Sequence, residues 1–246
     1  MSDLDQQLWD LAVANRILAR EGIVDAFGHV SIRHPGNPDR YFLSRSRSPE
    51  LVSRSDIVEY TLDNEPVLEA DRAPERKGYA ERPIHGGIYE TRADVMAVVH
   101  NHAHSVIPFG VTGVPMQQIL HVAGGIVDDS GTVPIWDIRD RFGDTNMLVT
   151  TQEQGLDLAR SLGGGGAVLM RGHGATTAAD TLIRAVHLAI YLSVNAELLL
   201  NTLRLGGTLK PMSAGESRLT GDMNTWPLVQ ARTWDNWKSR ANLDGV

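Results

Sequence analysis

The stretch that most constrains the fold is 81–102, in which a carboxylate, a short helix and an apolar strand follow one another closely. The strand, Val95–Val99, ends in His100-Asn101-His102. Because side chains alternate between the two faces of a strand, His100 and His102 project to the same side and could bind one cation. One packed and one solvated imidazole would give the same His-x-His pattern, so the pair by itself is weak evidence for a metal site.

A third histidine strengthens the prediction of a metal site. Far downstream, the apolar strand Ala167–Met170 runs into Arg171-Gly172-His173-Gly174, where the glycines give the backbone the freedom to aim an imidazole inward. Together with Glu81, three histidines form a nitrogen and oxygen donor set that suits Zn, Mn, Fe or Co. The sequence has no cysteine, so thiolate ligands and disulfides are excluded.

Three motifs in this order resemble the class II aldolase/adducin family: E-x-x-x-H-x-x-I-Y from Glu81, V-V-H-x-H ending at His102, and R-G-H-G around His173 followed by a long helix. The resemblance covers roughly 8–207. It implies that His100, His102 and His173 hold one divalent metal ion per chain and that Glu81 is the catalytic carboxylate beside it. It also implies a homotetramer with sites at subunit interfaces.

The sequence departs from the sugar-phosphate aldolases of that family where they hold the phosphate. The corresponding segments read Gly28-His29-Val30-Ser31, Ser44-Arg45-Ser46 and Tyr79-Ala80. An imidazole and an arginine replace neutral donors, so a substrate carboxylate is expected in place of a phosphate. The predicted substrate-binding residues are His29, Ser31, Ser44 and Arg45, whereas Arg47 is more typical of a solvated turn.

The aldolases also resemble one another in a tyrosine that an adjacent subunit lends to protonate the substrate. Here the matching segment, 117–125, contains no tyrosine. His121 is the candidate proton donor in its place, because an imidazole titrates near neutral pH; an interface histidine with a purely structural role is the equal alternative. His85 and His104 are expected behind the ligands or on the surface.

Composition limits the class of partner. The net charge of −7, without a long basic run, argues against nucleic acid and against an anionic membrane, and the substrate is expected to be small. The acidic N-terminus does not match a secretory signal, and no stretch was expected to reach the length of a membrane span. These features predict a cytoplasmic protein.

Helix and strand patterns predict one layered α/β/α domain with a central, mainly antiparallel sheet. The domain is expected to span 1–207, and residues 208–246, with Trp226, Trp234 and Trp237, to pack on it or on a neighbouring subunit. The four glycines Gly163–Gly166 precede a strand and lack a following Lys-Ser/Thr, so they predict a turn and not a phosphate loop. The expected helices lie at 3–21, at 83–89, at 152–162 behind a capping box at Thr151, and from a cap at Asp180 or Thr181 to 205. The expected strands lie at 27–33, 41–44, 57–62, 95–99 and 167–170.

The resemblance and its departures predict a metal-dependent carbon-carbon lyase. The favoured reaction is decarboxylation of a hydroxylated aromatic or heteroaromatic carboxylate or dicarboxylate through a metal-stabilised enolate or dienolate. The alternative is a class II aldolase that cleaves a hydroxy-keto or sugar-derived substrate, or a related epimerase. A non-catalytic, adducin-like binding module is a further alternative, against which the three retained histidines argue.

Overall fold

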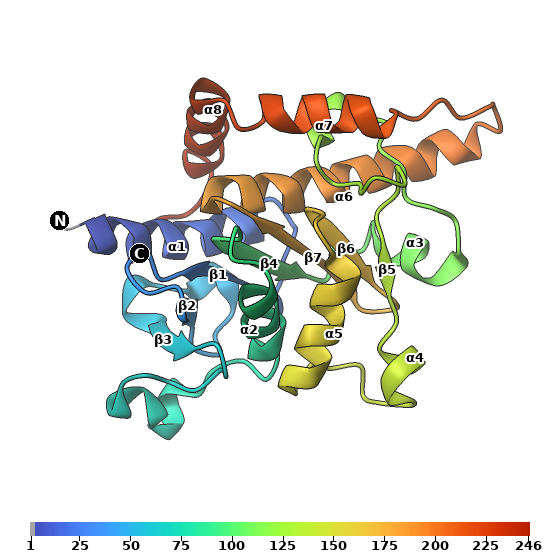
Figure 1. Ribbon diagram of the computed structural model, residues 1–246. Helices are drawn as coiled ribbons and strands as arrows, with labels where there is room; N and C mark the ends of the chain where they lie inside the picture. The colour runs from blue at the N-terminus through green and yellow to red at the C-terminus, as the bar shows by residue number, and fades with distance from the viewer. Residues whose placement is uncertain (1–2) are drawn as a thin grey trace.

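The computed structural model describes residues 3–246 and shows a seven-stranded sheet in the order β3-β2-β1-β4-β7-β6-β5 (Figure 1). All neighbouring strands are antiparallel except β5 and β6, which are parallel. Residues 1 and 2, the start of the predicted domain, lie outside the described residues. The strands are β1 (His29–Arg33), β2 (Arg40–Ser44), β3 (Ile57–Thr61), β4 (Ala97–Asn101), β5 (Ile135–Trp136), β6 (Ala167–Met170) and β7 (Gly174–Ala179).

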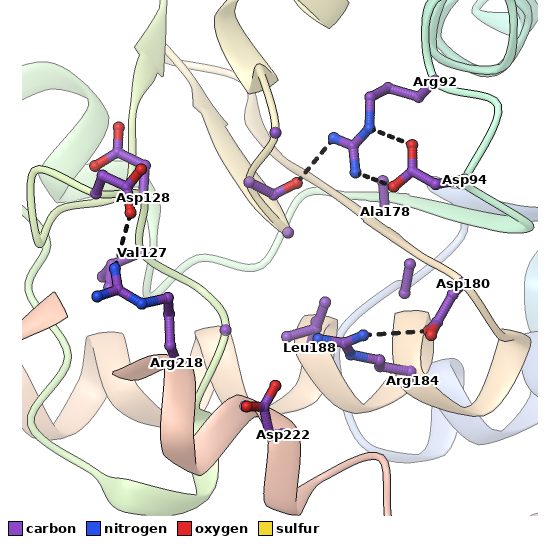
Figure 2. A pocket seen from close by; sticks show the side chains of 17 residues that line it. Arg92, Asp94, Val127, Asp128, Ala178, Asp180, Arg184, Leu188, Arg218 and Asp222 are labelled. Carbon is purple, nitrogen blue, oxygen red and sulfur yellow. Dashed lines mark hydrogen bonds and ion pairs between the residues drawn. The ribbon is translucent and has the colours of Figure 1, made fainter. Parts of the chain in front are cut away.

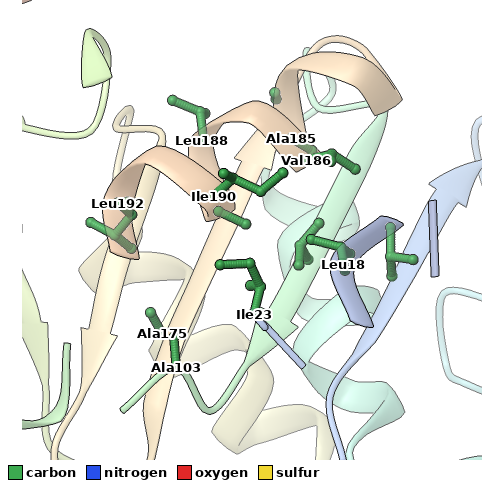
Figure 3. Packing of buried hydrophobic residues seen from close by; sticks show 14 of the residues in the cluster. Leu18, Ile23, Ala103, Ala175, Ala185, Val186, Leu188, Ile190 and Leu192 are labelled. Carbon is green, nitrogen blue, oxygen red and sulfur yellow. The ribbon is translucent and has the colours of Figure 1, made fainter. Parts of the chain in front are cut away.

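Helices cover both faces of this sheet, which confirms the predicted α/β/α layering (Figure 1). Alternation along the strands separates two cores: Ala97 and Val99 of β4 face one way, and Val98 faces the other. Figure 3 shows α6 packing its apolar side against the first of these faces. The helices are α1 (Asp3–Arg20), α2 (Arg82–Thr91), α3 (Ile107–Thr112), α4 (Ile138–Phe142), α5 (Gln152–Leu162), α6 (Leu182–Arg204), α7 (Ala214–Met223) and α8 (Pro227–Lys238).

Local signals in the sequence place several element ends correctly. The capping box predicted at Thr151 opens α5, with the Thr151 hydroxyl and the Gln154 side chain each bonded to the other residue's backbone. Thr181, one of two predicted caps, accepts a hydrogen bond from the Arg184 backbone at the start of α6. β7 was not predicted, because its sequence, GATTAA, lacks the large β-branched and aromatic residues typical of strands.

The expectation that no stretch reaches the length of a membrane span needs correction. Among the described residues, α6 is long and apolar enough to cross a membrane by length and composition alone, with a mean hydropathy of 1.4. More than half of that window is buried inside the protein, where α6 packs on β4 and β7. The helix is therefore apolar because it lies in the core, as its nearly all-round hydrophobic pattern indicated.

The C-terminal segment forms α7 and α8. Trp234 and Trp237 of α8 are buried in the same hydrophobic cluster as α1 and α6, whereas Trp226 is exposed. α7 packs on the short 3-10 helix η5 (His121–Ala123). The segment thus lies on its own domain, and the boundary at residue 207 stays a prediction.

Candidate active site

Three elements bring the predicted metal ligands together. His100 is the fourth residue of β4, and His102 follows the strand end. His173 lies in the turn between β6 and β7, where Gly172 adopts a φ of +65° that favours glycine. Glu81 is the N-cap residue of α2. One ligand atom from each of the four residues lies within 4.8 Å of the other three.

The distances within this cluster fit a metal ion. His102 Nε2 lies 3.1 Å from His100 Nε2 and 3.0 Å from His173 Nε2. Ligand nitrogens at the corners of a tetrahedron around Zn²⁺ stand about 3.3 Å apart. The Glu81 oxygens complete the set, at 3.6 Å from His173 Nε2 and 3.7 Å from His100 Nε2. The four side chains could therefore hold one divalent metal ion.

The surroundings keep these imidazoles in the form that binds metals. Burial lowers the pKa of His100 well below its usual value, and the neighbouring histidines lower it further. Burial also lowers the pKa of His102. Behind His100, its Nδ1 lies 3.3 Å from the Thr176 hydroxyl oxygen, whose proton is donated to the Met170 sulfur. The Nδ1 of His100 is then the donor and its Nε2 lone pair faces the cluster.

Glycine at position 174 allows β7 to approach β4 at this end of the sheet. A Cβ atom there would lie 2.0 Å from the Asn101 backbone oxygen, which no real side chain tolerates. The close approach sets His173 beside the end of β4. Glu81 is held from a third side, because its Oε1 accepts a hydrogen bond of 3.0 Å from the Val149 backbone.

The cluster borders a pocket of about 360 Å³. His29, Tyr79 and Arg47 give this pocket polar walls beside Glu81 and His102. The pairing of β1 with β4 sets His29 directly opposite His100. The Tyr79 ring lies 4.6 Å from the His29 ring, and its hydroxyl donates to the Arg47 carbonyl. The remaining lining residues are Ala26, Phe27, Gly28, Ser46, Ser48, Ala80 and Leu148.

Of the four predicted substrate-binding residues, only His29 lines this pocket. Ser44 is buried, and its hydroxyl lies 3.1 Å from the Tyr79 hydroxyl. Arg45 turns away and binds Asp56 through Nε at 2.7 Å. Arg47 takes the place expected for Arg45: it lines the pocket, and its buried Nε has no hydrogen-bond partner among the described residues.

Arg45 and Arg47 share one carboxylate. Burial acts to raise the pKa of Asp56, but hydrogen bonds from Ser53 and Arg45 and the charge of Arg47 outweigh it and lower the pKa. Arg47 contacts Asp56 through Nη1 at 3.4 Å. The guanidinium of Arg47 is thus oriented through Nη1, while its Nε faces no acceptor within residues 3–246.

Ser31, the fourth predicted contact, belongs to a polar row that sequence reasoning missed. We use this name for Tyr89, Ser31, His85 and His29, whose side chains are hydrogen-bonded in that order. Ser31 and His85 are fully buried. Because β1 points His29 and Ser31 toward α2, and α2 carries His85 one turn after Glu81, the row lies between sheet and helix.

His121 lies in η5, is exposed, and does not line the pocket of its own chain. Its predicted role therefore depends on a neighbouring subunit and stays a prediction. His85, placed behind the ligands or on the surface, is buried behind His29. Two signals could have found it: the i, i+4 spacing of Glu81 and His85 on one helix, and the alternation of His29 and Ser31 on the facing strand.

A larger pocket, of about 570 Å³, lies elsewhere, between α7 and the turn at 163–166 (Figure 2). Its arginines are paired with acidic side chains: Arg92 with Asp94, Arg184 with Asp180, and Arg218 with Asp129. No histidine lines it. Its three arginines are thus already paired and its five aspartates leave it acidic, which does not suit an anionic substrate, so the chemistry points to the pocket beside the histidines.

The comparison with protein families gives a match over most of the chain. Residues 9–200 match the model of the class II aldolase and adducin N-terminal domain. The chain belongs to the class II aldolase/adducin family. Its members include decarboxylases and aldolases, so the chain belongs to a family of enzymes.

Several relatives are named decarboxylases, two of them at 30% identity or more. Decarboxylase tropJ of Talaromyces stipitatus is 35% identical over 195 residues, covering 74% of this chain and 71% of that protein. The 3,4-dihydroxyphthalate decarboxylase of Arthrobacter keyseri is 30% identical over 246 residues, covering 92% and 94%.

Solved structures share the fold. An aldolase II superfamily protein from Pseudomonas syringae superposes with a TM-score of 0.73 at 20% identity, covering 96% of this chain and 92% of that one. L-fuculose 1-phosphate aldolase from Glaciozyma antarctica gives 0.71 at 19% identity, covering 96% and 88%. These likenesses confirm the class II aldolase fold.

Proposed function

We propose that this protein is a metal-dependent decarboxylase of hydroxylated aromatic or heteroaromatic carboxylates. The observation that carries the proposal is the Glu81 and three-histidine cluster opening onto a pocket that Arg47 lines. Two decarboxylase-named relatives at 30% and 35% identity support the same reaction class.

His100, His102 and His173 would hold one divalent ion, of Mn, Zn, Fe or Co, with Glu81 beside it. When bound, such an ion supplies Lewis acidity to an oxygen next to the bond that breaks. The chain's own residues then position the substrate. Arg47, with an unpaired Nε and a guanidinium suited to carboxylates, would bind a second acidic group, which favours dicarboxylates.

In decarboxylation the electrons of the broken carbon-carbon bond stay on the ring carbon, carbon dioxide leaves, and a proton must replace it. Glu81 borders the pocket and is a candidate for handling that proton. The second candidate is His121, exposed on η5, which would reach the pocket of a neighbouring subunit in a homotetramer. Loss of activity in His121→Ala, with subunits that stay assembled, would support the second candidate.

An aldolase is the alternative, favoured by the fold shared with L-fuculose 1-phosphate aldolase. The pocket walls favour the decarboxylase, since Tyr79 and His29 line them, and by the sequence resemblance these residues replace small phosphate donors of the sugar-phosphate enzymes. A pure binding module would not need four ligand atoms within 4.8 Å.

The deciding experiment supplies the purified protein with one metal at a time, from Mn, Zn, Fe and Co. Carbon dioxide release is measured from salicylate and from dihydroxyphthalates, and aldol cleavage from L-fuculose 1-phosphate. We expect metal-dependent carbon dioxide release, faster with the dicarboxylates. Aldol cleavage without carbon dioxide release would overturn the proposal in favour of the aldolase.

A further inference from the structure

The polar row connects the buried core to the wall of the pocket. The Tyr89 and Ser31 hydroxyls are 2.8 Å apart, and Ser31 Oγ lies 2.6 Å from His85 Nδ1. His85 Nε2 in turn lies 2.7 Å from His29 Nδ1. Tyr89 at the far end is 1% exposed, whereas His29 lines the pocket. No step of the proposed function uses this row.

In one arrangement the hydroxyl protons of Tyr89 and Ser31 and the ring proton of His85 all find acceptors within the row, and only the ring proton of His29, at the pocket wall, is left without one. Tyr89 donates to Ser31, Ser31 donates to His85 Nδ1, and His85 Nε2 donates to His29 Nδ1. In the reverse arrangement the Tyr89 proton has no acceptor among the described residues. A buried donor without a partner is costly, so the first arrangement is favoured.

The burial of His85 agrees with this arrangement. It lowers the pKa of His85 to about 3, so this ring is neutral near pH 7. A neutral imidazole carries one proton, on either Nδ1 or Nε2. Since His29 Nδ1 accepts from His85, the proton of His29 is left on Nε2.

We infer that the polar row fixes His29 in its Nε2–H tautomer, and that this N–H donates to an anionic oxygen of the substrate, with His85 as the positioning residue. Among the described residues His29 Nε2 has no hydrogen-bond partner, and the ring lies between Tyr79 and His100 at the pocket wall. That the acceptor is a carboxylate or phenolate oxygen of the substrate rests on the proposed function. The tautomer of His29 does not depend on it.

The tautomer is tested by nitrogen-15 NMR on histidine-labelled, zinc-loaded protein, because zinc is diamagnetic. We expect the His29 ring to carry its proton on Nε2 in the wild type. In Ser31→Ala and Tyr89→Phe the His29 ring should be a mixture of the Nδ1–H and Nε2–H tautomers. Tyr41→Phe is the matched control: it removes a buried phenol bonded to Asn64, outside the row, and should leave the tautomer unchanged.

Two NMR outcomes would overturn the inference. A wild-type His29 with its proton on Nδ1 would show that the row runs in the opposite direction. An unchanged tautomer in both Ser31→Ala and Tyr89→Phe would show that the row does not set it. Circular dichroism identifies any variant that fails to fold, and the other variant then provides the test.

The donor role is tested by salicylate binding to the same zinc-loaded protein. His29→Leu, which removes the N–H, should weaken binding by about tenfold, the effect of losing one hydrogen bond to a charged group. His29→Gln, which keeps an N–H at a similar reach, should retain most of the affinity. Equal affinities in the two variants would overturn the donor role. Neither readout needs turnover, so a failure of decarboxylation would overturn the proposed function separately.

Discussion

At the scale of single residues, the proposed metal ligands give the most direct test. His173 sits in the turn between β6 and β7, and its Nε2 is 3.0 Å from that of His102. We expect His173→Ala to lose the divalent ion, from about one per chain to none, because two histidines and a carboxylate bind far more weakly. Elemental analysis of the purified protein measures this.

His104→Ala is the matched control for that experiment. His104 is an exposed histidine two residues beyond His102, and it is not part of the ligand cluster. Its variant should keep a full complement of metal. Equal metal content in His173→Ala and His104→Ala would contradict the three-histidine site.

The side chain of Arg47 lines the pocket and that of Arg45 does not, and this difference gives a second prediction. Arg47→Ala should raise KM for a dihydroxyphthalate by roughly 10- to 100-fold, the effect of losing a charge-assisted hydrogen bond, with a much smaller effect on salicylate. Arg45→Ala also loses a contact to Asp56 but leaves the pocket wall intact. Steady-state kinetics compare the two; a larger KM effect in Arg45→Ala would contradict the assignment.

At the scale of elements, the sequence predicted most of the helices and strands but not which helix covers which residues of the sheet. The strand ending in His100 and the turn at His173 follow from local patterns, so it was predictable that these side chains lie close together. His29 and Ser31 alternate with Val30, the usual pattern of a strand with one solvated face, but α2 covers that face. Arg45 and Arg47 follow the end of β2, where strand alternation no longer predicts direction.

The contact between α2 and α5 positions Glu81 and gives an element-scale prediction. A Cβ atom on Gly155 of α5 would lie 2.0 Å from the Pro83 backbone oxygen of α2. Gly155→Ala should therefore force the helices apart, destabilise the protein by about 1–3 kcal/mol, and weaken metal binding because Glu81 caps α2. Urea unfolding and zinc titration measure the two effects.

Gly215 in α7 provides the control for that substitution. Its nearest heavy atom to an added Cβ would be the Ser213 hydroxyl oxygen at 3.7 Å, an ordinary contact. Gly215→Ala should leave zinc binding unchanged and stability equal or slightly raised, since alanine favours helix. A Gly155→Ala protein as stable as Gly215→Ala would show that α2 and α5 are not in backbone contact.

At the scale of the whole molecule, burying neutral histidines makes stability depend on pH. Burial lowers the pKa of His85 to about 3, whereas an unfolded histidine titrates near 6.5. Between these values the unfolded chain binds one more proton than the folded one. The contribution of His85 to the free energy of unfolding is therefore fully present above about pH 6.5 and is lost as the pH falls toward 3. His29 and His100, whose pKa values are also lowered, act in the same direction.

Metal-free protein, prepared with EDTA, should thus lose stability between pH 6.5 and 5, with about 1.4 kcal/mol per pH unit from each fully buried histidine. Urea unfolding at several pH values measures the slope. His85→Gln keeps a polar side chain beside His29 and Ser31 but cannot titrate, so its slope should be smaller by about that amount. Identical slopes in wild type and His85→Gln would mean that His85 is protonated equally in the folded and unfolded states, contrary to its burial behind the pocket wall.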